Sequence, residues 1–170
     1  FREIRMIEQM GVEIRTEQAL GRDFTLAGLR EDGYQAVFLG VGAPECMGLG
    51  IPGEDARGVV EAGNFLRQYN IRGSVPVGKR VVVVGGGNAA IDAARTALRL
   101  GAESVKIVYR RSREQMPAYS EEIEEALNEG VELMPLTQPV AVETTQQGEA
   151  RALRCTSMTL GEFDRSGRRR

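Results

Sequence analysis

The chain has 170 residues, enough for one well-packed domain or for a small domain joined to part of another. Charged residues make up 27% and hydrophobic residues 42%, and the net charge of −2 argues against a nucleic-acid partner and against a disordered tail. No apolar run reaches the roughly 18–20 residues of a membrane span and no secretory leader opens the sequence, so we expect no membrane partner and a cytoplasmic setting.

The first part of the chain predicts one helix and two strands. Apolar residues recur at helical spacing over residues 2–10, and Gly11 follows, the residue type that most easily ends a helix. Residues 12–15, Val-Glu-Ile-Arg, alternate between apolar and polar side chains, which predicts a strand with one solvated face. Residues 36–39, Ala-Val-Phe-Leu, are continuously apolar and predict a buried strand.

A connection between two units follows. Residues 44–58 contain two prolines and four glycines among other turn-forming residues. We therefore divide the chain into a first unit, residues 1–54, and a second unit, residues 55–170. The second unit begins with a predicted helix over residues 59–69 and a short linker over residues 73–78.

The clearest pattern is a β-α-β unit. Residues 80–84, Arg-Val-Val-Val-Val, are typical of a strand covered on both faces in a parallel sheet. A predicted helix over residues 88–100 follows and ends at Gly101, and residues 104–109 complete the unit in about 30 residues, the length that a right-handed crossover requires. The inward face of the helix is expected to hold Ile91, Ala94, Ala97 and Leu98.

The last third continues the same alternation. Residues 120–128 predict a helix with Ser120 as its N-cap and Gly130 just beyond its end, and residues 131–134 predict a third strand. Residues 138–163 alternate and contain turn residues, as a β-hairpin or meander does. The predicted fold class is therefore α/β, a Rossmann-like parallel sheet with helices on both faces plus a β-hairpin or meander.

Two distant segments resemble each other. After Glu3 and after Glu122 the sequence continues with isoleucine, and eight residues beyond each glutamate stands glycine-valine-glutamate and an aliphatic residue. In the second copy Gly85 precedes Gly130 by 45 residues, and the same offset from the first copy falls before Phe1. Unless the match is chance, we expect a fragment, the tail of one nucleotide-binding domain followed by most of another.

The turn Gly85-Gly86-Gly87-Asn88-Ala89-Ala90 lies between the first strand and the helix of the β-α-β unit. Gly85 permits the tight exit from the strand, Gly87 lets the backbone approach a pyrophosphate, and Ala90 is small enough for the helix to pack on the strand. The N–H groups and dipole of the helix N-terminus stabilise an anion there, and Asn88 could cap the helix or bond a phosphate oxygen. The alternative is a strand-turn-helix corner without a ligand.

Arginines follow the second strand where an NAD site carries an acid. An Asp or Glu about 20 residues after the glycine turn bonds the ribose 2′-hydroxyl of NAD. This chain instead has Arg110, Arg111 and Arg113, whose guanidinium groups could clamp a 2′-phosphate. The pattern predicts NADPH over NADH, and the alternative is a solvated arginine-rich loop.

No side chain is predicted to be catalytic or to bind a metal. The chain has no histidine, the commonest general base. Cys46 and Cys155 are far apart, form no CxxC pair, and are interpreted as small buried hydrophobic residues. Asp92 and Arg95, three residues apart on one helix, predict a structural ion pair. Any redox chemistry would then belong to a cofactor.

Two runs carry a specific family resemblance. Residues 82–95, VVVGGGNAAIDAAR, followed by residues 108–118, VYRRSREQMPA, resemble the small (beta) subunit of glutamate synthase and its relatives, including the matching module of dihydropyrimidine dehydrogenase. Residues 36–43 and 49–55 are similar to the exit of that family from its FAD domain.

The resemblance implies a flavoprotein with two dinucleotide-binding domains, in which an NADPH domain is inserted into an FAD domain. Hydride would pass from NADPH to FAD, and electrons would leave through an iron–sulfur centre or a larger partner subunit. FAD and any iron–sulfur cluster are expected in the parent protein or its partner, not in this chain. Carried over by position, the residues that hold the pyrophosphate and the 2′-phosphate would be Gly85, Gly86, Gly87, Asn88 and Ala89, and Arg110, Arg111 and Arg113.

The leading hypothesis is the NADPH-binding portion of a flavin-dependent oxidoreductase, with residues 1–54 as part of the FAD domain and its connector. The fragment is not expected to be active alone. Two alternatives stay open, a stand-alone NAD(P) dehydrogenase and a nucleotide-binding or scaffold module without turnover.

Overall fold

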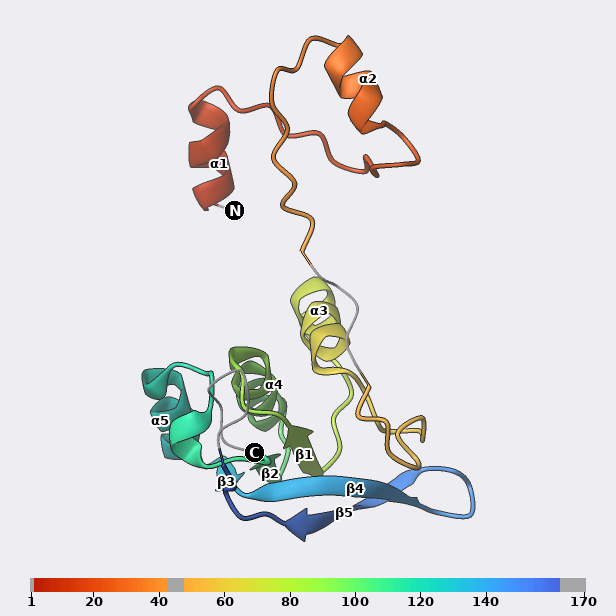
Figure 1. Ribbon diagram of the computed structural model, residues 1–170, viewed down its shortest axis with the longest axis vertical. Helices are drawn as coiled ribbons and strands as arrows, with labels where there is room; N and C mark the ends of the chain where they lie inside the picture. The colour runs from red at the N-terminus through yellow and green to blue at the C-terminus, as the bar shows by residue number, and fades with distance from the viewer. Residues whose placement is uncertain (1, 43–47, 163–170) are drawn as a thin grey trace. The chain divides into compact units, whose positions relative to one another are not determined.

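The computed structural model describes residues 2–42 and 48–162. It divides into two compact units, Phe1–Ala43 and Pro44–Arg170, which are drawn in Figure 1.

The first unit contains two short helices. Helix α1 spans Arg2–Gln9, close to the predicted range. Helix α2 spans Leu26–Glu31, which the sequence analysis did not predict, and the Thr25 hydroxyl caps it by accepting the N–H of Gly28 at 3.0 Å. No described side chain of this unit is buried.

Both strands predicted for this unit are wrong for the described chain. Residues 12–15 and 36–39 form no strand, and the second run is exposed, with Phe38 95% and Leu39 54% accessible. A strand needs a hydrogen-bonded neighbour, and no described segment pairs with either run. Both runs have a strand-like pattern, but no described sheet includes them.

The second unit is built on a parallel sheet. Strands β1 (Arg80–Val84), β2 (Ser104–Val108) and β3 (Glu132–Met134) pair in the order β1-β2-β3, with Val84 opposite Val108. Helix α4 (Asn88–Arg99) connects the first two strands, and helix α5 (Ser120–Asn128) connects the last two. The predicted α/β fold with a parallel sheet and a β-α-β crossover is confirmed, but in the described part of the chain the helices lie on one face of the sheet, not on both faces as predicted.

Helix α3 (Ala62–Arg72) precedes the sheet and starts three residues later than predicted. Residues before it are extended, with Glu61 as the N-cap, and Gly73 ends it as a left-handed C-cap. Helix α4 contacts α3, α5, β1 and β2, so the three helices form one layer on the sheet (Figure 1).

A β-hairpin completes the unit, as predicted. Strands β4 (Thr137–Thr144) and β5 (Ala150–Ser157) pair antiparallel, and β4 contacts β2. In Figure 1 this ribbon lies on the side of the sheet away from α4. The connector before α3 is bound to the hairpin, since the N–H of Val142 donates to Pro52 O at 2.8 Å and the N–H of Ala150 donates to Arg57 O at 2.7 Å.

The core lies between α4 and the sheet. Ile91, Val105 and Ile107 are its largest fully buried side chains, and they pack with alanines of α4 that let the helix approach the strands closely. The prediction that β1 is covered on both faces is wrong at Val82, which is 45% exposed. Successive side chains of a strand point to opposite faces, so Val82 lies on the face opposite buried Val83.

A charged cluster joins α4 to α5. The Arg95 guanidinium lies 2.6 Å from Glu122, 2.8 Å from Glu125 and 2.7 Å from Glu129, and only 14% of its side chain is exposed. The predicted ion pair between Arg95 and Asp92 is therefore wrong. Two carboxylates of α5 and that of its C-cap residue, Glu129, hold the guanidinium, a contact that the spacing along one helix could not reveal.

The N-cap prediction for α5 is also wrong. Ser120 is the first helical residue, and Tyr119 occupies the N-cap position without a side-chain capping bond. The extended backbone of Tyr119 instead places its N–H toward the glycine turn, as described below.

Candidate functional site

The turn between β1 and α4 has the backbone geometry that the glycines predict. Gly85 leaves the strand with φ of +135°, a conformation that side-chain-bearing residues rarely adopt, and its N–H donates to Val108 O at 3.0 Å. A Cβ built on Gly85 would lie 3.4 Å from the Cβ of Ala90. Gly85 and Ala90 together allow the strand and the helix to pack closely at the turn.

Gly86 is required by packing. A Cβ built on it would lie 2.6 Å from a ring carbon of Tyr109, closer than real Cβ contacts come. Tyr109, at the end of β2, is 8% exposed. Gly86 thus has a packing role beside the phosphate-binding role predicted for it, and Tyr109 is a residue of this turn that the sequence pattern did not reveal. The only sequence signal for this aromatic contact is an aromatic residue at the end of the neighbouring parallel strand.

Gly87 faces open space and begins the helix. A Cβ built on it would meet no atom within 4 Å, and it is the N-cap of α4 without a side-chain cap. Among the described residues, the N–H groups of Gly87, Asn88 and Ala89 have no hydrogen-bond acceptor. Free N–H groups at a helix N-terminus, together with the helix dipole, form a binding site for an anion.

Asn88 does not cap α4. Its side-chain oxygen accepts the backbone N–H of Tyr119 at 3.0 Å, and no side-chain capping bond is present at this N-terminus. The N–H of Ala118 donates to Gly86 O at 3.1 Å. The start of α5 is therefore bound to the glycine turn at two points.

The arginine segment, residues 110–115, begins at the edge of the sheet where the glycine turn lies. Because Val84 and Val108 are partners in register, the glycine turn after β1 and the arginines after β2 leave the sheet side by side. Arg110 is exposed, and no interaction of its side chain is found among residues 2–42 and 48–162. The backbone of Arg111 is fixed, since its carbonyl accepts the N–H of Leu136 at 2.9 Å.

Arg113 lies in a single 3₁₀ turn, η1 (Arg113–Gln115), and forms an ion pair with Glu124 of α5. The side chains of this pair are 42% and 60% exposed, so solvent screens it and an anionic ligand could compete for the guanidinium. In the same turn, hydrogen bonding to the Ser112 side chain lowers the pKa of Glu114.

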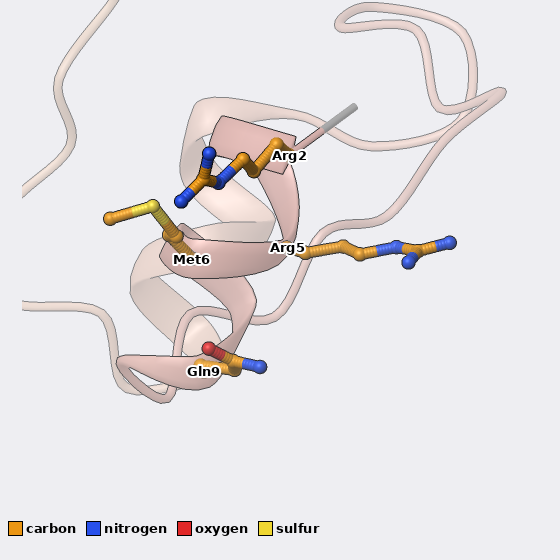
Figure 2. A pocket seen from close by; sticks show the side chains of 4 residues that line it. All are labelled: Arg2, Arg5, Met6 and Gln9. Atoms are coloured by element: carbon orange, nitrogen blue, oxygen red, sulfur yellow. The ribbon is translucent and has the colours of Figure 1, made fainter.

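The described residues offer no metal centre, since no group of three or more Cys, Asp or Glu side chains among them could hold an ion. Cys155 is a partly buried free thiol, and its burial raises its pKa. Cys46 lies outside the described residues. A hollow on α1 is lined by Arg2, Arg5, Met6 and Gln9 (Figure 2), but these side chains come from one helix and point in different directions, so they do not enclose a ligand.

No described helix is both long enough and apolar enough to cross a membrane. Among the described residues, the glycine turn, the N-terminus of α4 and the adjacent arginines bring together N–H and guanidinium groups of the kind that bind anions.

Known proteins share this sequence over nearly its whole length. It is 42% identical over 172 residues to the beta subunit of an NADPH-Fe(3+) oxidoreductase from Geobacter sulfurreducens. This alignment covers 99% of this chain and 25% of the relative. It is 40% identical over 172 residues to the glutamate synthase [NADPH] small chain of Escherichia coli, in an alignment that covers 95% of this chain and 36% of the relative. The chain thus spans between a quarter and two fifths of the length of these relatives, and the predicted resemblance is confirmed.

Solved structures show the same fold. FprA, an oxidoreductase of Mycobacterium tuberculosis whose complex with NADPH has been solved, matches 89% of this chain with a TM-score of 0.75 at 23% sequence identity, over 49% of its own length. A family model described as pyridine nucleotide-disulphide oxidoreductase matches residues 3–163. The chain therefore belongs to the pyridine nucleotide-disulphide oxidoreductase family.

Proposed function

We propose that the second unit binds NADPH. The observation that carries the proposal is the free N-terminus of α4, where Gly87 faces open space and the N–H groups of Gly87, Asn88 and Ala89 have no acceptor among the described residues. A pyrophosphate placed there would accept these N–H groups and lie at the positive end of the helix dipole. Gly85 and Gly86 shape the turn that makes this approach possible.

The arginines direct the proposal to NADPH in preference to NADH. Arg110, Arg111 and Arg113 follow β2, at the edge of the sheet where the glycine turn also lies. Guanidinium groups bind phosphate oxygens in pairs, whereas the 2′-hydroxyl of NADH offers them no anionic group. The names of both curated relatives contain NADPH, which supports the same choice.

We further propose that the parent protein is an FAD-containing oxidoreductase that passes hydride from NADPH to FAD. An iron–sulfur centre or a larger partner subunit would accept the electrons. Residues 1–54 would belong to the FAD domain and its connector, and residues 55–170 to the NADPH domain. The first unit supports this assignment because its apolar residues, such as Met10 and Phe38, are exposed, as they would be in part of a domain. A cytoplasmic location remains a prediction.

When bound, NADPH supplies a hydride, and the residues of this chain bind and orient it. No described side chain is assigned a catalytic role. The glycine turn fixes the pyrophosphate, the arginines fix the adenosine end, and the direction of the nicotinamide follows from these two anchors.

A binding experiment tests the proposal. NADPH and NADH are titrated into the 170-residue chain and into the Arg110→Ala/Arg111→Ala variant, with binding followed by calorimetry. The matched control is Arg67→Ala/Arg72→Ala, which removes two exposed arginines from α3. We expect wild type and control to prefer NADPH, and the first variant to bind NADPH at least about tenfold more weakly with NADH unchanged, because charge-assisted hydrogen bonds contribute about 1.5–3 kcal/mol each.

Equal binding of both cofactors to wild type, or an Arg110→Ala/Arg111→Ala variant that binds both unchanged, would contradict the proposal. Absence of any binding would favour a scaffold module. Oxidation of NADPH by the chain with an added carbonyl substrate and no flavin would favour a stand-alone dehydrogenase.

A further inference from the structure

Tyr109 lies between the two parts of the proposed NADPH site. Its ring packs against Gly86 of the glycine turn, where a Cβ would come within 2.6 Å of it. Its hydroxyl donates to the backbone carbonyl of Gln115 at 2.8 Å. Only 8% of the residue is exposed, so both contacts are made by a buried side chain. One side chain thus touches the glycine turn and the arginine segment at once.

The carbonyl that Tyr109 binds belongs to the turn that carries an arginine. Gln115 is the last residue of η1, and Arg113 is the first. Within this turn the N–H of Gln115 donates to Ser112 O at 3.1 Å and the N–H of Met116 donates to Arg113 O at 3.0 Å. These hydrogen bonds fix the backbone of the turn. The hydroxyl of Tyr109 connects the turn to the sheet.

The far end of the segment is bound to the same glycine turn. Beyond η1, the N–H of Ala118 donates to Gly86 O at 3.1 Å, and the N–H of Tyr119 donates to the side-chain oxygen of Asn88 at 3.0 Å. The backbone of Tyr109 is itself fixed in the sheet, since its N–H donates to Met134 O at 3.0 Å. The segment from residue 109 to residue 119 is thus closed on the glycine turn by backbone and side-chain bonds.

We propose that Tyr109 is a positioning residue that sets the preference for a 2′-phosphate, by holding the arginine segment at a fixed distance from the glycine turn. This inference rests on the proposed NADPH site and adds a residue to it. One ribose and its 5′ carbon join the 2′-phosphate to the pyrophosphate and limit the range of their separation, so two binding elements that contact both must be held within that range. Arginine side chains are flexible, and a fixed backbone lowers the conformational entropy that they lose on binding.

The test is the variant Tyr109→Phe, which keeps the ring against Gly86 and removes only the hydroxyl. The matched control is Tyr69→Phe on α3, where the same atom is removed from a side chain that makes no hydrogen bond in the described structure. Dissociation constants are measured for NADPH and NADH, and for adenosine 2′,5′-bisphosphate and AMP, which isolate the 2′-phosphate from the nicotinamide half. Circular dichroism and thermal unfolding verify that each variant is folded.

We expect Tyr109→Phe to weaken binding of NADPH and of adenosine 2′,5′-bisphosphate by about three- to tenfold, with NADH and AMP unchanged. Without the hydroxyl bond the arginine segment must be ordered when the ligand binds, at a cost no larger than the free energy of one buried hydrogen bond. In the Arg110→Ala/Arg111→Ala/Arg113→Ala background the same substitution should add less than about twofold, because the segment that Tyr109 holds then carries no guanidinium group. Tyr69→Phe should change none of the four constants.

Three results would overturn the inference. A parallel loss for all four ligands would make Tyr109 a general support of the fold, and no loss for any would make its hydroxyl irrelevant to binding. An undiminished effect in the background that lacks all three arginines would show that Tyr109 does not act through those side chains. A wild-type chain without preference for NADPH would refute the proposed site itself, whereas a preference that Tyr109→Phe retains refutes only the role of Tyr109.

Discussion

Alanine at Gly86 should lower the stability of the fold, whereas alanine at Gly87 should weaken NADPH binding. At Gly86 the new Cβ would lie 2.6, 2.7 and 3.0 Å from three atoms of the Tyr109 ring, so the ring must move. Overpacking of this kind costs about 1–3 kcal/mol, and loss of the hydroxyl bond of Tyr109 to Gln115 adds about 1 kcal/mol. At roughly 3–4 °C per kcal/mol, Gly86→Ala should lower the melting temperature by roughly 6–16 °C.

Gly87→Ala should behave differently. Its backbone has φ of −90° and ψ of 171°, which alanine adopts without strain, and no atom lies within 4 Å of the new Cβ. Alanine is a poorer N-cap than glycine but restricts the unfolded chain more, so the free energy of unfolding should change by less than about 1 kcal/mol. The methyl group would, however, occupy the space proposed for the pyrophosphate, and NADPH should bind at least about tenfold more weakly.

Calorimetric melting and NADPH titration on both variants make the comparison. A Gly86→Ala variant that melts with the wild type would refute the packing of Tyr109 on the turn. A Gly87→Ala variant that binds NADPH as tightly as the wild type would refute the position proposed for the pyrophosphate.

Three further outcomes are expected. Arg95→Ala should lower the free energy of unfolding by about 1–3 kcal/mol in urea titrations, because it leaves the partly buried Glu129 without its main partner, and an unchanged midpoint would show that the cluster contributes nothing. The hydrogen bond from Arg95 lowers the pKa of Glu129 below its ordinary 4.5, so its contribution is complete above about pH 4.5 and is lost as pH falls through the lowered folded-state pKa; the acid-induced fall in melting temperature should be smaller in Glu129→Gln. NADPH affinity should fall between low and high salt in the wild type and fall less in Arg110→Ala/Arg111→Ala, as fluorescence titration would measure, and equal salt dependence would exclude these charges from binding.

The elements of the second unit were predictable because they depend on local patterns. A run of valines, a helix with small residues on one face and a glycine after its end specify strand and helix over short windows. The β-α-β crossover and the hairpin follow from the order of these elements, since a parallel neighbour requires a connecting helix. The resemblance to known flavoprotein subunits rested on the same contiguous residues.

The strands predicted in the first unit failed for a physical reason. Residues 12–15 and 36–39 have strand-like patterns, but a strand exists only with a hydrogen-bonded neighbour, and none is present among the described residues. A local pattern indicates that a segment can form a strand when another strand lies beside it, but it does not show whether that neighbouring strand is present.

The sequence by itself determined the turn from Gly85 to Ala90, its place between a strand and a helix, and the arginines that follow the next strand. Only the tertiary structure decided how these residues are held. It showed that Tyr109 makes Gly86 necessary, that Asn88 binds the start of α5, and that Arg95 pairs with carboxylates of that helix. Each of these contacts joins residues between 23 and 34 positions apart, and such contacts depend on the packing of whole elements, which no spacing within one element encodes.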